Sequence, residues 1–203
     1  DMPTQDQVDA YLPPYAPRQI LDPAEPVSIG AMVGPEAFME VRYLAHAKQM
    51  RALDLIPGWA EEFRRAFGRD SGGLLHSYRA EDAEIMVVAL GSVLGTIKDT
   101  VDELRERGIR IGVLGITCFR PWPQDAVRTA LAHAKQVIVL EKSLAVGLGG
   151  IVSTNVRTSY AGKPDAVRTV IAGLGGRTIT RASLRSAFEQ ALDGTLGALT
   201  FLD

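Results

Sequence analysis

The sequence predicts an α/β fold in which helices cover both faces of a mostly parallel, five-stranded β-sheet. Short apolar runs rich in valine and isoleucine recur along the chain, at residues 84–90, 109–116, 136–140 and 167–172, and residues 74–78 are expected to form a further short strand. Segments with apolar residues at helical spacing separate most of these runs, and glycine or proline clusters mark the turns. Because a strand, a helix and a further strand in this order form a right-handed crossover, neighbouring strands are expected to be parallel. The predicted architecture is a three-layer α/β/α domain.

The clearest evidence is a complete strand–helix–strand unit in residues 84–123. Its first strand, 84–90, is a continuous apolar run, which is typical of a strand buried on both faces. Thr96 is the expected N-cap of the helix that follows, and Gly108 is expected to end this helix in a left-handed conformation. The buried face of the helix is expected to comprise Ile97, Val101 and Leu104. Residues 109–116 then form the second strand of the unit.

The remaining elements follow from the same signals. Residues 124–134 have helical periodicity, and a further helix is expected after Gly150. Thr180 is the expected N-cap of the last helix. The buried face of that helix is expected to comprise Leu184, Ala187, Phe188, Ala191 and Leu192.

Two different segments precede the α/β domain. Residues 1–34 are rich in proline, which favours extended backbone, and apolar residues alternate with the prolines. A free linker would not have so much apolar surface, so we expect an extended arm that lies along another surface. Residues 35–73 are expected to form a helical connector of two helices, the second starting at Pro57 and ending at Gly68. The predicted α/β domain then comprises residues 74–203.

The composition excludes several classes of protein. The 203 residues have a net charge of −2, which gives no indication of binding to nucleic acid or to an acidic membrane surface. No apolar run is long enough for a membrane span, and no signal peptide is visible, so a cytoplasmic location is expected. Cys118 is the one cysteine, which excludes disulfides within the chain and any cysteine-ligated cluster held by this chain alone.

A turn with two glycines lies between the strand 84–90 and the next helix. The candidate anion or interface sites in it are Gly91, Ser92, Gly95 and Thr96. Open α/β sheets bind anions at such a junction of a strand end and a helix start, through backbone N–H groups. No lysine follows the second glycine, so this is not the phosphate loop of an NTPase. The favoured alternative is a tight turn that needs glycine for steric reasons.

Two other segments that follow a strand are weaker candidates. Residues 147–150 form part of a dinucleotide fingerprint, but Val152 stands where its third glycine should be, so we reject this interpretation. Residues 141–143, Glu-Lys-Ser, are placed like a catalytic cluster. A salt-bridged strand terminus is the commoner explanation.

Arg120 lies in the rigid segment 119–123, Phe-Arg-Pro-Trp-Pro. An arginine held there either anchors a carboxylate across an interface or stacks on Trp122. The histidines show no metal-ligand spacing; they are His46, His76 and His133. We therefore assign no catalytic, cofactor-binding or metal-binding residue, and the residues alone indicate a scaffold domain.

Short motifs recur along nearly the whole chain: 12–15 with 21–23 (LPPY, LDP), 62–63 with 67–69 (EF, FGR), Tyr78 with 81–84 (EDAE), 91–92 with 95–96 (GS, GT), 119–123 (FRPWP) and 172–177 (AGLGGR). Each motif alone is unspecific. Together, their order and spacing resemble the C-terminal half of the α subunit of the 2-oxoacid:ferredoxin oxidoreductases, the pyruvate:ferredoxin oxidoreductase family.

The resemblance implies a transketolase C-terminal-like domain from Leu74 onward, whose first strand runs antiparallel to the other four. It also implies oxidation of a 2-oxoacid to acyl-CoA and CO2, with electrons passed to ferredoxin or a similar acceptor. The implied cofactors of the whole complex are thiamine diphosphate with Mg2+ and [4Fe-4S] clusters. The thiamine-binding, γ and ferredoxin-like domains or subunits would hold them, and this segment alone would hold none.

The resemblance leaves the substrate open, because Trp122 stands where pyruvate enzymes often have phenylalanine. Pyruvate, a branched 2-oxoacid, an aryl 2-oxoacid and another 2-oxoacid all remain candidates. Two alternatives also stay open: a non-catalytic module that binds a small anion or assists assembly, and the C-terminal domain of another thiamine enzyme. The arm and the helices before Leu74 argue against the second alternative.

Overall fold

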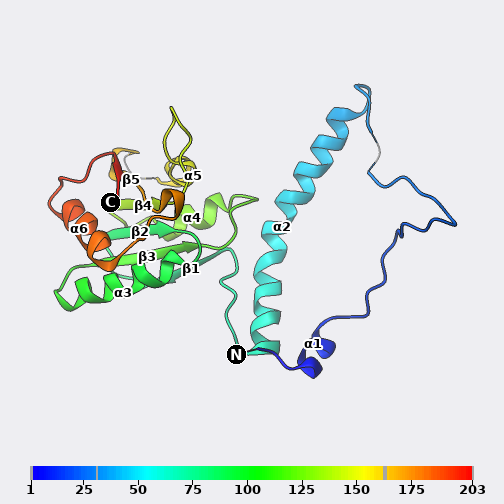
Figure 1. The fold of residues 1–203 in the computed structure, drawn as a ribbon, viewed down its shortest axis with the longest axis horizontal. Helices are drawn as coiled ribbons and strands as arrows, with labels where there is room; N and C mark the ends of the chain where they lie inside the picture. Colours follow the sequence, from blue (N-terminus) through cyan, green and yellow to red (C-terminus); the bar gives the residue numbers. More distant parts are fainter. Residues whose placement is uncertain (1, 31, 162–163, 203) are drawn as a thin grey trace. The chain divides into compact units, whose positions relative to one another are not determined.

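The computed structural model of the chain describes residues 2–30, 32–161 and 164–202. The chain divides into two compact units, residues 1–71 and 72–203. The second unit contains the sheet and is an α/β domain, as predicted (Figure 1).

The sheet of the second unit has six strands in the order β1-β3-β2-β4-β5-β6. The strands are β1 (Leu75–Tyr78), β2 (Ile85–Ala89), β3 (Ile111–Ile116), β4 (Gln136–Glu141), β5 (Val167–Ile171) and β6 (Leu199–Phe201). As the resemblance implied, β1 is antiparallel to its neighbour β3, and the other pairs are parallel. The predicted number of five strands is wrong, because β6 pairs with β5 in the register Thr169↔Leu199. Since β6 has only three residues and is largely exposed, it lacks the buried apolar run that marked the other strands.

Helices cover both faces of this sheet (Figure 1). The helices of this unit are α3 (Val93–Glu106), α4 (Gln124–Ala130), α5 (Ile151–Ser159) and α6 (Arg181–Leu192), with short 3-10 turns at Pro164–Ala166 and Leu174–Gly176. Helices α3 and α6 pack together over one face, and α4 and α5 pack together over the other. The chain is thus a three-layer α/β/α sandwich in this unit, as predicted.

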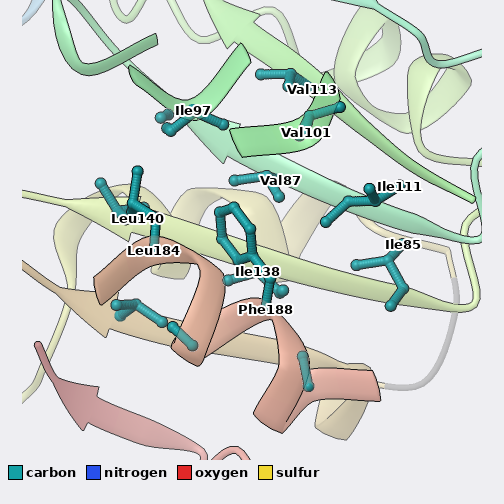
Figure 2. Close-up of a cluster of buried hydrophobic side chains, with 14 of the residues drawn as sticks. Ile85, Val87, Ile97, Val101, Ile111, Val113, Ile138, Leu140, Leu184 and Phe188 are labelled. Atoms are coloured by element: carbon teal, nitrogen blue, oxygen red, sulfur yellow. The ribbon is translucent and has the colours of Figure 1, made fainter. Parts of the chain in front are cut away.

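The larger core lies between the sheet and the pair α3 and α6 (Figure 2). Ile97 and Val101 of α3 and Phe188 of α6 are fully buried against the sheet, where they meet Val87 and Ile138. Truncating a buried phenylalanine such as Phe188 to alanine costs about 3–5 kcal/mol, so this layer contributes much of the stability. The predicted buried faces of α3 and α6 are confirmed, with one exception. Leu192 at the end of α6 is 42% exposed, because the helix ends at that residue.

The first unit contains one long helix, α2 (Phe38–Phe67), which continues through Pro57. The prediction of two helices is therefore wrong. Proline removes a single backbone hydrogen bond and already has a helical φ, so long helical segments on both sides of it can remain continuous at a local cost. Gly68 ends α2 in the left-handed conformation, as predicted, with its N–H donated to the Arg64 carbonyl at 2.8 Å. In the described part of the chain, no helix combines the length and the apolar character that a membrane crossing needs.

The segment expected to be an extended arm begins with a short helix, α1 (Gln5–Tyr11). Thr4 and Gln7 form a capping box at its start. The sequence prediction missed this helix because it gave more weight to the prolines of the segment. The Tyr11 ring packs edge-on against Phe63 and Phe67, with centroid distances of 6.2 and 5.0 Å. This aromatic cluster gives α1 a packing partner within its own unit.

Candidate functional site

The carboxyl ends of the parallel strands meet at one edge of the sheet. Strand β2 leads through α3 to β3 on one side, whereas β4 lies on its other side. The order of strands therefore reverses between β2 and β4, which is where open α/β sheets bind ligands. A hollow of about 220 Å³ lies at this point; its lining residues are Leu90, Val93, Leu140, Glu141, Lys142, Ser143 and Val152.

The turn after β2 differs from its prediction in one respect. Helix α3 begins at Val93 with Ser92 as N-cap, so the prediction that Thr96 caps the helix is wrong. The reason is that Gly91, at φ +74°, turns the chain into the helix directly after the strand. Thr96 lies within α3, where its carbonyl accepts a hydrogen bond from the Thr100 hydroxyl at 2.8 Å. The left-handed φ of Gly91 supports the interpretation of a tight turn.

The hollow does not include the predicted anion residues. Gly91, Ser92 and Gly95 are exposed, and none of the predicted residues of this turn is among those that line the hollow. The side chain of Ser92 makes no capping hydrogen bond to α3. What the structure does bring together is the end of β2 with the segment 141–143 at the end of β4.

Glu141 is a buried carboxylate that caps α5 from the end of the neighbouring strand. Its Oε2 accepts the N–H of Val152 at 2.7 Å, and its Oε1 accepts the N–H of Ser153 at 3.1 Å. The Ser143 hydroxyl donates to Oε2 at 3.3 Å. Free N–H groups and the positive end of the dipole make a helix start favourable for an anion, which here is the protein's own side chain.

This arrangement contradicts the salt-bridged strand terminus expected at Glu141. Lys142, the adjacent basic residue, is exposed, and none of the ion pairs described in the structure includes Glu141. Both carboxylate oxygens accept hydrogen bonds from N–H groups of α5, so Glu141 holds the start of this helix against the end of β4. Lys142 and Ser143 also line the hollow, and the Ser143 hydroxyl already donates its proton to Glu141.

Gly150, the last glycine of the segment 147–150, lies against this same carboxylate. Gly150 has an ordinary φ of −75°, yet a Cβ there would overlap the Glu141 carboxylate and the Ser153 hydroxyl. The glycine at this position is thus explained by the close approach of the Glu141 and Ser153 side chains to the backbone, and a bound phosphate is not needed to explain it. Since Glu141 occupies the start of α5, the amides that a dinucleotide would use are already bonded.

Arg120 is exposed and folds back onto its own neighbour. Its guanidinium lies 4.1 Å from the centroid of the Phe119 ring, and its Nη1 donates to the Phe119 carbonyl at 2.8 Å. Of the two alternatives for Arg120, stacking on Trp122 is therefore wrong, and pairing with a carboxylate across an interface stays a prediction. Trp122 instead packs edge-on against Phe119 at 6.0 Å and donates its indole N–H to the Ser159 hydroxyl at 2.7 Å, so its ring is held between the loop and α5.

A second hollow of about 220 Å³ lies at the ends of β5 and β6; it is lined by Ile171, Ala172, Gly173, Leu174, Arg177, Phe201 and Leu202. The side chain of Lys142 reaches towards it, because a Cβ on Gly173 would lie 3.2 Å from the lysine Cε. The prediction missed this hollow because it missed β6, which supplies Phe201.

Reactive side chains are dispersed in the described part of the chain, where no three His, Cys, Asp or Glu residues gather as a metal site would require. Cys118 is buried, burial raises the pKa of its thiol, and its Sγ donates to the Pro121 carbonyl at 3.3 Å. His76 pairs with the Thr117 hydroxyl at 3.3 Å and His133 with the Ala80 carbonyl at 2.9 Å, on different elements.

Similarity to known proteins agrees with the fold and identifies the family. The pyruvate synthase subunit PorA of Methanothermobacter thermautotrophicus is 39% identical over 184 residues, which cover 91% of this chain and 47% of that protein. PorA of Methanosarcina barkeri is also 39% identical, over 92% of this chain and 47% of the relative. The ketoisovalerate oxidoreductase subunit VorA of Pyrococcus horikoshii is 31% identical over 93% of this chain and 49% of the relative.

The chain thus spans about half the length of the curated relatives it matches. A family model described as the pyruvate:ferredoxin oxidoreductase core domain II matches residues 83–184, which include the hollow between β2 and β4 and the first turn of α6. The chain therefore belongs to the pyruvate:ferredoxin oxidoreductase core domain II family.

Proposed function

We propose that this chain is part of the α subunit of a thiamine diphosphate-dependent 2-oxoacid:acceptor oxidoreductase, in which it acts as a scaffold between subunits. The observation that supports this most is the 39% identity to a pyruvate synthase subunit over 91% of the chain. The relatives are named as subunits, so the partners proposed are the thiamine-binding, γ and ferredoxin-like domains or subunits.

The proposed reaction converts a 2-oxoacid anion and coenzyme A into acyl-CoA, CO2 and one proton, and two electrons pass to ferredoxin or a similar acceptor. Pyruvate and ketoisovalerate, named for the relatives, are both 2-oxoacids, so the substrate class is proposed and its member is left open. Trp122 does not decide between them, because its indole N–H bonds to Ser159 within the domain and its ring is half-buried there.

The described residues do not fit the cofactors of the proposed complex. Thiolates hold a [4Fe-4S] cluster, whereas Cys118 is alone, buried and bonded to a carbonyl. A Mg2+ site for thiamine diphosphate needs several oxygen ligands, and in the described residues no acidic cluster of that kind gathers. We therefore propose that thiamine diphosphate, Mg2+ and the clusters are held by other parts of the complex, and we assign this chain no chemical step.

The first unit supports a role in assembly. Its described residues include none that is buried, although large apolar side chains are frequent in it. Some of the most exposed are Tyr15, Leu21, Met32, Met39 and Tyr43. So much bare apolar surface marks an interaction site. We propose that the arm, 1–34, and the connector, 35–73, bind other parts of the oxidoreductase while residues 74–203 form the scaffold domain.

The test is reconstitution of the full-length subunit with the other subunits of its complex. We expect a stable assembly that reduces ferredoxin, or a viologen dye in its place, only when coenzyme A and a 2-oxoacid are both present. Pyruvate, ketoisovalerate and an aryl 2-oxoacid are compared to identify the substrate. A chain that stays monomeric with every candidate partner, and that supports no 2-oxoacid-dependent reduction, would overturn the proposal.

The hollow between β2 and β4 favours one second candidate, a module that binds a small anion. Lys142 supplies a positive charge among its lining residues and Ser143 a hydroxyl, beside apolar walls and the Glu141 carboxylate, whose oxygens are bonded to N–H groups of α5. Calorimetry of the chain with inorganic phosphate and with acetate tests this function, with Lys142→Met as the control. Micromolar binding that disappears in the variant would support the module, and no heat in either protein would exclude it.

A further inference from the structure

The loop that follows β3 buries most of its residues and exposes a single charged side chain. Within the described segment 118–123, Cys118, Pro121 and Pro123 are buried, and the rings at positions 119 and 122 are half-buried. Arg120 is the exposed residue of this segment. The Cys118 thiol donates to the Pro121 carbonyl at 3.3 Å, which ties together the backbone on both sides of Arg120. The loop is therefore a fixed base for one exposed guanidinium.

Direct contacts connect this guanidinium to the last turn of α5. The Arg120 guanidinium lies 4.1 Å from the centroid of the Phe119 ring, and this ring packs edge-on against Trp122 at 6.0 Å. The Trp122 indole N–H donates to the Ser159 hydroxyl at 2.7 Å. The same hydroxyl donates its proton to the Asn155 carbonyl at 3.1 Å. An exposed charge and a buried hydroxyl of a different element thus belong to one series of contacts.

Ser159 supplies this series of contacts with a hydrogen-bond acceptor inside the domain. Its side chain is buried, and its single proton goes to the carbonyl four residues back in α5. A serine bond of this kind does not strengthen a helix, so the contribution of the hydroxyl is to accept the indole N–H of Trp122. A half-buried indole N–H without an acceptor loses a hydrogen bond. The hydroxyl therefore fixes the orientation of the Trp122 ring.

We propose that Ser159 is a positioning residue for Arg120 and that it acts through the rings of Trp122 and Phe119. A cation is attracted to the face of an aromatic ring, so the orientation of Phe119 decides where the guanidinium lies. A guanidinium already held in place loses less conformational entropy when it pairs with a carboxylate. The inference rests on the proposed function, which supplies that carboxylate. The contacts lie within the domain, so the positioning is the same whichever part of the complex pairs with Arg120.

NMR of the chain measures the position of Arg120 directly. The Phe119 ring shifts the side-chain signals of Arg120 upfield while the two are stacked, and Phe119→Leu gives the reference without this ring. Ser159→Ala should move the Arg120 signals towards that reference. One cation–π contact at an exposed site corresponds to about a two- to fivefold change in the ratio of stacked to unstacked side chain, and we expect a change of this size.

Two further variants separate positioning from a merely structural bond. Thr158→Ala is the matched control, because the Thr158 hydroxyl also donates to the Asn155 carbonyl, at 2.7 Å, but has no described hydrogen bond to Trp122. It should leave the Arg120 signals unchanged. Trp122→Phe removes the indole N–H, so it should move the Arg120 signals by itself, and adding Ser159→Ala to it should have no further effect. If Ser159→Ala does not fold, Trp122→Phe breaks the same bond and replaces it.

Two NMR results overturn the inference. One is that the Arg120 signals keep their wild-type positions in both Ser159→Ala and Trp122→Phe. The other is that Ser159→Ala has its full effect in a protein that already contains Trp122→Phe, because the hydroxyl then acts by another route.

Assembly of the reconstituted complex with the full-length subunit gives a second measurement. Ser159→Ala should weaken assembly by about two- to fivefold, in the same direction as Arg120→Ala, and Thr158→Ala should not. If Arg120→Ala weakens assembly but Ser159→Ala assembles like the wild type, the inference is overturned and the proposed function stands. If the wild-type subunit forms no complex, the proposed function fails, and the NMR measurements still decide whether Ser159 positions Arg120.

Discussion

The Glu141 carboxylate at the end of β4 accepts the backbone N–H of Val152, in the first turn of α5, at 2.7 Å. The two residues line the same hollow, and they join a central strand to a helix on the surface of the sheet. A buried charge of this kind is tolerated because the helix N–H groups replace its water. The pair thus turns a segment that resembles a catalytic cluster into a structural anchor.

Glu141→Gln tests this anchor. The amide is nearly the same shape, but one of its two ends donates, so it cannot accept both helix N–H groups. We expect a loss of about 1.5–3 kcal/mol in the free energy of unfolding, as for a hydrogen bond to a charged group. Urea unfolding measures it. Glu189→Gln, which removes an exposed ion pair with Arg107, is the control and should cost under about 1 kcal/mol. Equal effects would contradict the anchor.

Two glycine-to-alanine changes form a second, opposed pair. Gly150→Ala should destabilise the domain by about 1–3 kcal/mol, because the new methyl group overlaps the Glu141 carboxylate. Gly95→Ala should stabilise it by about 0.4–1 kcal/mol, since no atom lies within 4 Å of a Cβ there and alanine restricts the unfolded chain. Thermal melting measures both changes, and the melting temperature should fall for Gly150→Ala and rise for Gly95→Ala. Shifts in the same direction would show that the crowding at Gly150 is relieved by movement.

Asp102 makes the stability depend on pH on the acid side. The Tyr78 hydroxyl, at 2.7 Å, and secondly the Arg79 guanidinium hold the pKa of Asp102 below its ordinary value. A carboxyl whose pKa is lower in the folded state contributes stability above its ordinary pKa, and this is lost as the pH falls through the folded-state pKa. Tyr78→Phe should raise the pKa of Asp102 and flatten this loss. NMR titration and urea unfolding at several pH values measure both; an unchanged pKa would exclude Tyr78 as the main cause.

Arg120 remains a predicted interface residue, and in the structure its guanidinium lies over the Phe119 ring. Because the side chain is exposed, Arg120→Ala should change the free energy of unfolding of the isolated chain by less than about 0.5 kcal/mol. If Arg120 pairs with a carboxylate of another subunit, the same change should weaken assembly by about 2–5 kcal/mol, since the partner charge is left unpaired. Arg120→Lys should fall between. Mass photometry of the complex decides, and an assembly as tight as that of the wild type would remove Arg120 from the interface.

Deletion of residues 1–30 tests the arm. The α/β domain forms a separate compact unit, so its free energy of unfolding should stay within about 0.5 kcal/mol of the wild-type value. Association with partner subunits should weaken, because the arm exposes apolar residues such as Tyr15 and Leu21 that binding would cover. Analytical ultracentrifugation of the reconstituted complex measures the difference. Unchanged assembly would mean that the arm makes no contribution to it.

Local sequence patterns determined most of the α/β domain and the end of α2. The buried runs of β2 to β5, the helical spacing of Ile97, Val101 and Leu104, and the stop at Gly68 all depend on residues close together in the chain. A strand buried on both faces appears in the sequence as a continuous apolar run, and a helix with one buried face appears as apolar residues at helical spacing, so both can be predicted without a structure. Strand β6 was missed because its pairing with β5 joins residues far apart in the chain. The continuity of α2 through Pro57 was missed because proline is typical of the first position of a helix but is also tolerated, at a local cost, inside one.

The candidate site was decided by the tertiary structure. The sequence places Glu141 and Val152 eleven residues apart, and no local rule makes a strand-end carboxylate the cap of a helix on the far side of a glycine loop. The same contact explains Gly150, whose requirement comes from a side chain and not from its own φ. Arg120 and Phe119, by contrast, are neighbours whose stacking depends on a single rotamer. Short-range order is encoded in the spacing of residues, whereas contacts between elements exist only once the sheet has brought its carboxyl ends together.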